Sequence, residues 1–101
     1  NIPEMAALAR DHWKRENPKV YRQMVEDGAL VEESEAAADL TLQEMKALML
    51  VKMTEQEAWQ ASRHLFIFRT ADELEEDYQP QRDEAGKVIH WKWPEEPPPP
   101  R

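Results

Sequence analysis

The chain has 101 residues and no cysteine, which excludes disulfide bonds, thiolate metal sites and thiol nucleophiles. Its formal net charge of −8 disfavours non-specific binding to nucleic acid or to an anionic membrane. No apolar run approaches the roughly 20 residues that a membrane-spanning helix needs. We therefore expect one small domain without a membrane span, and a cytoplasmic location, because the lack of cysteine fits a reducing compartment.

Two helices are predicted in the first 27 residues. The first, over residues 3–15, has apolar residues at spacings of three and four along one face: Ile2, Met5, Ala9 and Trp13. Asn17-Pro18 is typical of a helix start, because Asn caps free N–H groups and Pro fits the first helical position. Gly28 is typical of a helix end, since glycine enters the left-handed conformation at little cost. The second helix is therefore predicted over residues 18–27.

Threonine and glutamate at capping-box spacing predict three further helix starts. The pairs are Thr41 with Glu44, Thr54 with Glu57 and Thr70 with Glu73. They predict a third helix over residues 42–52, a fourth over 55–69, and a short acidic turn or helix to residue 76. The preceding Ala/Glu-rich stretch, residues 29–39, favours a helix by propensity but offers only a weak apolar face.

The C-terminal quarter differs in character. A turn signal at residues 83–86 precedes the β-branched and aromatic run of residues 88–93, which predicts a β-hairpin or single strand. Residues 95–101 should form an extended polyproline tail. The predicted fold is all-α, a small four-helix domain over residues 1–77, with the hairpin or strand over 78–94 and the Pro-rich tail over 95–101.

No group of residues predicts catalysis. His12, His64 and His90 lack the spacing of metal ligands, and neither Ser34 nor Ser62 lies in a nucleophile elbow. With two glycines in the chain, a phosphate-binding loop is not expected. We expect a protein that is not an enzyme and that needs no cofactor or metal.

The predicted third helix is apolar around much of its circumference, more than short neighbouring helices can cover. This favours a homodimer or a protein partner that packs on Leu42, Met45 and Met49. Trp91 and Trp93 share one face of the predicted strand, and paired tryptophans are typical of interface hot spots. The expected function is therefore protein interaction.

Nucleic-acid binding is the alternative. Residues 1–25 carry five basic and three acidic side chains, a local charge of +2, whereas residues 26–57 carry nine acidic and two basic ones, a charge of −7. The five basic residues could contact a phosphate backbone: Arg10, Lys14, Arg15, Lys19 and Arg22. The acidic segment could instead imitate a phosphate backbone, and the Pro-rich tail could dock in an aromatic groove.

A pattern of single residues in a helical frame extends over residues 8–68. It consists of Leu8-Ala9, His12-Trp13, Pro18, Tyr21, Met24, Gly28 and Leu30, an Ala/Glu-rich helix, and Glu57-Ala58-Trp59. This layout resembles small helical proteins encoded in phages, prophages and transposons, including the TnpV-like family. The resemblance implies an accessory protein of a mobile element, and it transfers no catalytic or binding residue.

Overall fold

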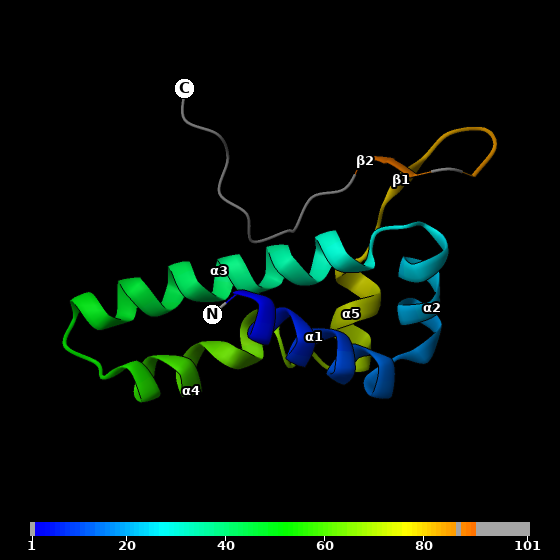
Figure 1. Ribbon diagram of the computed structural model, residues 1–101. Helices are drawn as coiled ribbons and strands as arrows, with labels where there is room; N and C mark the ends of the chain where they lie inside the picture. Colours follow the sequence, from blue (N-terminus) through cyan, green and yellow to red (C-terminus); the bar gives the residue numbers. More distant parts are fainter. Residues whose placement is uncertain (1, 87, 91–101) are drawn as a thin grey trace, which may run out of the picture.

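The computed structural model describes residues 2–86 and 88–90, and within them the chain forms five helices and two short strands (Figure 1). The helices are α1 (Ile2–Glu16), α2 (Pro18–Glu26), α3 (Leu30–Leu50), α4 (Glu55–Phe66) and α5 (Ala71–Asp77), and the strands are β1 (Gln81–Arg82) and β2 (Val88–His90). The all-α class is confirmed. The count of four helices is wrong for the described residues, because the acidic stretch after Thr70 forms a helix of its own.

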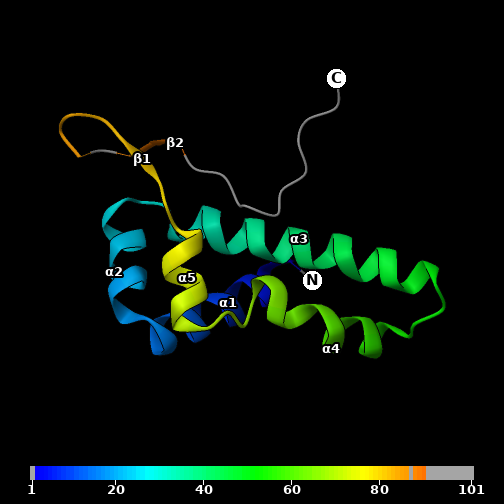
Figure 2. The ribbon, with the colours of Figure 1, turned by 180° about the vertical axis from the view of Figure 1, so that it is seen from behind.

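The longest helix, α3, runs across the whole molecule and packs against both α1 and α4 (Figures 1 and 2). Small side chains dominate this contact, and the ones that are fully or almost fully buried are Ala6 and Ala9 of α1, Ser34, Ala37, Ala38 and Thr41 of α3, and Ala58 and Ser62 of α4. Small side chains let helix backbones approach closely, so packing rather than large apolar residues holds this part of the core.

The predicted start of the third helix is wrong. The helix begins at Leu30, twelve positions before the expected Leu42. Thr41 is buried in the middle of α3, where its hydroxyl donates to the Ala37 carbonyl oxygen at 2.8 Å instead of capping a helix. The alanines of the stretch that was predicted to have only a weak apolar face are buried where α3 packs against α1. Tertiary packing therefore decides where the helix starts.

The fourth helix is also shorter than predicted, and it ends at Phe66 instead of near residue 69. Its buried face is formed by Ala58, Ser62 and Phe66, at a regular spacing of four. Leu65 lies outside this buried face and is 47% exposed.

Most other helix ends match their predicted signals. The Asn17 side chain accepts a hydrogen bond from the Val20 N–H at 3.2 Å, with Pro18 at the first helical position. Gly28 has φ of 69°, and the next N–H, that of Ala29, donates to the Met24 carbonyl at 2.9 Å, which completes a Schellman motif. Both later capping boxes, at Thr54 and Thr70, form with reciprocal hydrogen bonds.

Two side chains at the end of α1, together with Asn17 directly after it, hold the linker between α4 and α5 and the first residue of α5. The fully buried Trp13 donates its indole N–H to the Ile67 carbonyl at 3.0 Å. His12 Nε2 lies 3.0 Å from the Arg69 carbonyl oxygen, and Asn17 Nδ2 donates to the Ala71 carbonyl at 3.0 Å. One short segment, residues 12–17, thus satisfies backbone carbonyls that lie more than 50 positions away in sequence.

The linker residue Arg69 is itself almost fully buried. It forms an ion pair with Asp77 at the end of α5, and its guanidinium lies 5.5 Å from the centroid of the Phe66 ring. A buried charge requires such a partner, because an unpaired one loses its hydration without compensation. The pair therefore fixes α5 against the linker.

The strands are attached to the end of α2 through the Asp27 carboxylate. It accepts hydrogen bonds from the Tyr78 hydroxyl at 2.7 Å and from both terminal nitrogens of Arg82 at 2.6 and 2.7 Å. Arg82 pairs with Val88 across an antiparallel register in which Gln81 faces His90. The rest of the predicted strand, including Trp91 and Trp93, lies outside the described residues.

The end of α3 contains a conformation that glycine would adopt more easily. Lys52 has φ of 71° and occupies the same position after α3 that Gly28 occupies after α2. We expect Lys52→Gly to raise the free energy of unfolding by about 0.5–1 kcal/mol, because a Cβ in the left-handed region is strained. Thermal or urea unfolding measures the change.

Two matched variants complete this test. Lys52→Ala removes the charge but keeps the Cβ, so it should not stabilise the protein. Gly28→Ala should destabilise it by about 1 kcal/mol for the same steric reason. A stabilisation by Lys52→Ala equal to that by Lys52→Gly would contradict the conformational explanation.

The Asp27 cluster predicts a pH dependence of stability. The Arg82 hydrogen bonds lower the pKa of the Asp27 carboxyl below its usual value, with a smaller contribution from Tyr78. The stability from this carboxylate is therefore complete above the unfolded pKa near 4 and is lost as the pH falls through the lowered folded pKa. We expect Asp27→Asn to cost about 1 kcal/mol at pH 7, a value that allows for solvent screening.

The difference between the unmodified protein and Asp27→Asn should shrink as the pH falls below about 4. Urea unfolding at several pH values measures it. Asp11→Asn is the matched control, since its 3.3 Å ion pair with Arg15 is exposed and should contribute little. A constant difference across the acid range would contradict the assignment.

Candidate functional site

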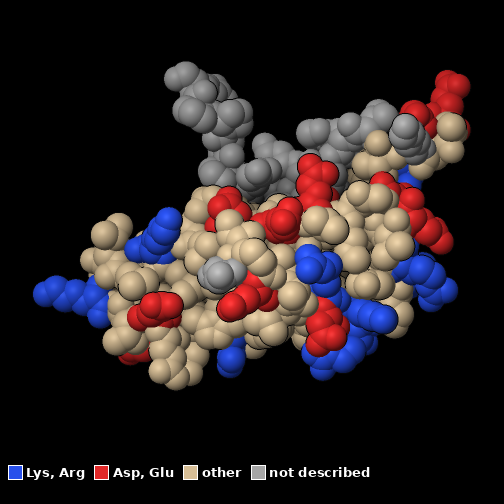
Figure 3. Space-filling view, viewed as in Figure 1, with Lys and Arg blue, Asp and Glu red and all other residues tan. Residues whose placement is uncertain are grey.

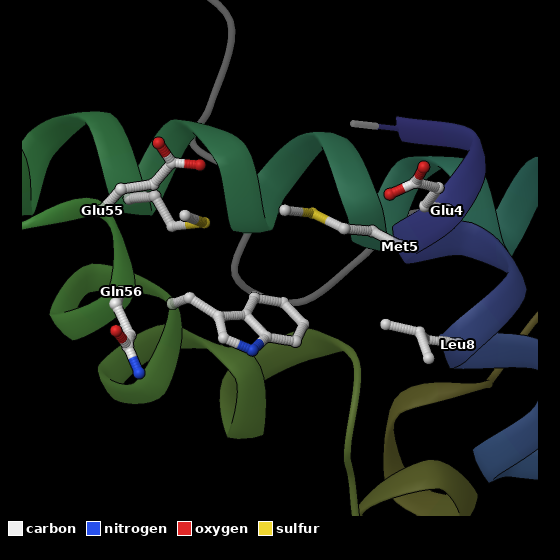
Figure 4. Close-up of a pocket in the computed structure, with 7 residues that line it drawn as sticks. Glu4, Met5, Leu8, Glu55 and Gln56 are labelled. Carbon is white, nitrogen blue, oxygen red and sulfur yellow. The ribbon is translucent and has the colours of Figure 1, made fainter.

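A groove of about 480 Å³ opens between the beginnings of α1 and α4, with α3 behind it (Figure 4). Four apolar side chains line it: Met5, Leu8, Met45 and Trp59. Its polar lining consists of Glu4, Glu55 and Gln56. Figure 4 shows Glu4 and Glu55 on opposite sides of the opening, each near the start of its own helix.

The two sides of the groove are built in the same way. On α1 the lining residues are Glu4, Met5 and Leu8, and on α4 they are Glu55, Gln56 and Trp59, both at relative positions one, two and five. Each glutamate lies in the first turn of its helix, where the helix dipole favours a negative charge. Leu8 follows Glu4, and Trp59 follows Glu55, by about one helical turn. Each pair therefore lies on one face of its helix.

The inner wall of the groove is well supported. Met45 is 5% exposed, so it forms part of the core as well as the groove. The Trp59 ring meets the Phe68 ring edge to face, with centroids 6.0 Å apart. By contrast, Leu8 is 45% exposed. The groove thus presents a fixed apolar wall with an accessible rim, and its chemistry suits a bulky apolar group accompanied by a positive charge.

A second apolar surface lies where α3 ends and turns into α4. Leu50 is 86% exposed and Val51 is 70% exposed, and Met49 and Met53 are exposed beside them. We call these four residues the tip patch. A contiguous patch of exposed apolar residues marks an interaction site more often than single exposed residues do. The patch exists because α3 continues beyond the part that α1 covers.

The predicted interface residues lie in different environments. Leu42 is half-buried, Met45 belongs to the groove, and Met49 belongs to the tip patch. Trp91 and Trp93 fall outside the described residues. The described part of the predicted interface is therefore divided between the two apolar surfaces.

Of the five basic residues of the predicted nucleic-acid surface, Arg10 is half-buried and the other four are exposed. Arg10 donates to the Ser34 hydroxyl at 2.8 Å and so links α1 to α3. Arg15 is paired with Asp11, and the Lys14 ammonium lies 6.0 Å from the Tyr21 ring centroid. Lys19 and Arg22 are exposed on α2. Figure 3 shows lysine and arginine side chains gathered over the α1–α2 corner, with acidic ones among them.

Among the histidines considered as metal ligands, His12 has a structural role, because it contacts the linker backbone at the Arg69 carbonyl. Within residues 2–86 and 88–90, no three histidine, aspartate or glutamate side chains form a group that could hold a metal ion. In the same part of the chain, no helix is both long enough and apolar enough to cross a membrane.

Sequence reasoning did not find the groove. Sequence patterns identify Met5 and Met45 as apolar positions on separate helices, whereas Glu4 and Glu55 carry no signal. The two walls are about 50 positions apart in sequence, and no local pattern indicates that the starts of α1 and α4 lie together. The repeated spacing of glutamate and apolar residue is visible only once both helices are placed.

No protein-family model matches the chain, and no curated protein or solved structure matches it either. The resemblance to TnpV-like proteins therefore stays a prediction.

Proposed function

We propose that this protein acts by protein–protein interaction and that its partner is a second copy of the chain. The observation that carries this proposal is the tip patch, where Leu50 and Val51 are consecutive large apolar residues that are mostly exposed. Covering such residues removes apolar area from water and favours association. Such a role fits the accessory protein of a mobile element that the resemblance to TnpV-like proteins implies.

The charges around the tip patch support a second copy as the partner. Exposed Lys46 and Lys52 lie on the α3 side of the patch, and exposed Glu55 and Glu57 lie on the α4 side. A two-fold axis at the patch lets the lysines of one copy face the glutamates of the other, so that the surface complements itself. A dimer formed in this way would bury the patch without leaving like charges opposed.

The double variant Leu50→Glu/Val51→Glu tests the proposal. We expect the unmodified chain to sediment at twice its 11.9 kDa mass at micromolar concentration. The double variant should dimerise about 100-fold more weakly, as expected for the loss of two hot-spot side chains. Analytical ultracentrifugation measures both.

Val31→Glu is the matched control, because Val31 is 60% exposed on the opposite end of the same helix. It should leave the dimer intact, and circular dichroism should show equal helix content in all three proteins. An unmodified chain that sediments as a monomer throughout the micromolar range would overturn the proposal.

Nucleic-acid binding remains the second candidate, supported by the basic side chains over the α1–α2 corner (Figure 3). On this alternative the chain binds short duplex DNA at low salt, and the logarithm of affinity falls linearly with that of salt concentration. Lys19→Glu/Arg22→Glu should then weaken binding, whereas Lys46→Glu/Lys52→Glu at the other end should not. Fluorescence anisotropy measures binding, and no binding at low salt removes the alternative.

A further inference from the structure

We propose that the groove between α1 and α4 is the receptor site for the Trp91-Lys92-Trp93 segment of a second copy. This inference rests on the proposed function for the identity of the partner, but it concerns a different surface from the tip patch.

The groove selects for an apolar ligand with a positive charge. Its wall is formed by Met5, Met45 and Trp59, and thioether and aromatic groups pack well against aromatic rings. The exposed carboxylate-bearing residues Glu4 and Glu55 lie at opposite sides of the mouth (Figure 4). Its volume of about 480 Å³ can accept more than one large side chain.

The segment Trp91-Lys92-Trp93 has the matching chemistry. In an extended chain the two tryptophans point to one face and the lysine points to the other. When the tryptophans occupy the apolar wall, the lysine stands at the mouth, at the level of Glu4 and Glu55. Alternation therefore supplies the apolar and the cationic contacts from three consecutive residues.

The attachment of the strands to α2 places His90, the residue before the segment, away from the groove of its own chain. The described chain ends at His90, which pairs with Gln81 beside the Asp27–Arg82 contact. From there, Trp93 reaches about 10 Å at most. The groove residue Met45 lies 15 positions along α3 from Leu30, which corresponds to about 22 Å of helix.

Figure 1 shows β2 near the α2 end of α3 and the turn into α4 at the other end. A second copy removes this limit. If each copy lends its segment to the other, the exchange is reciprocal and closes as a two-fold dimer.

A complementation experiment with full-length variants tests the exchange. Leu8→Glu places a charge in the groove, and Trp91→Ala/Trp93→Ala removes the ligand. Each protein alone should associate about 10- to 100-fold more weakly than the unmodified chain. An equimolar mixture should recover part of the lost affinity, because the intact segment of the first variant can enter the intact groove of the second.

Two controls separate docking from loss of structure. Leu65→Glu is the matched control for Leu8→Glu, since Leu65 is 47% exposed on α4 and does not line the groove. It should leave association unchanged. Lys92→Glu should weaken association, and combining it with Glu4→Lys should restore it, since attraction between opposite charges returns. Circular dichroism verifies that every variant is folded.

The outcomes distinguish this inference from the proposed function. If the tip-patch variant dissociates and the groove and tryptophan variants remain dimeric, self-association stands and the groove proposal is overturned. If the mixture associates no better than its folded components, exchange between copies is overturned. If the complementation works while the tip-patch variant stays dimeric, the groove is the interface and the tip patch is not.

Discussion

The arrangement of this protein depends on how the end of α1 holds the linker between α4 and α5. Trp13, His12 and Asn17 bind the carbonyls of Ile67, Arg69 and Ala71, which alternate along the chain between the end of α4 and the start of α5. These contacts supply hydrogen-bond partners for a linker that leaves helical geometry inside the fold, where unsatisfied carbonyls would be costly. They also fix both neighbours of the linker, so that α4 lies opposite α1 and α5 leads the chain back to Asp27. The groove and the strand attachment both follow from that placement.

A second constraint is the difference in character between the two halves of α3. Its first half carries Ser34, Ala37, Ala38 and Thr41, which are small enough for α1 to approach closely. Its last turn carries Met49 and Leu50, which extend past α1 and stay exposed. The first half therefore stabilises the monomer through close packing, and the end leaves apolar area for another molecule. One helix contributes to the fold at one end and to the proposed interaction at the other.

Local signals predicted those parts of the fold that local hydrogen bonds control. Asn17-Pro18, Gly28, and the boxes at Thr54 and Thr70 act through backbone groups within a few residues, and each forms as predicted. The box at Thr41 failed because the same spacing also occurs inside a helix, where the hydroxyl bonds back to the preceding turn. Propensity and apolar content alone underestimated how much residues 30–41 contribute to the core. The contribution of an alanine to packing depends on the helix that faces it.

The candidate surfaces also divide into features that the sequence predicts and features that only the tertiary structure decides. The sequence by itself determined that the end of the third helix carries more apolar side chains than a small domain can bury, and that Trp91 and Trp93 form a separate aromatic pair. Only the tertiary structure decided that Glu4 and Leu8 face Glu55 and Trp59 across a groove, because these pairs are brought together by linker contacts more than 50 positions apart. Helix ends are set by hydrogen bonds between near neighbours, whereas a groove exists only where separately formed helices meet.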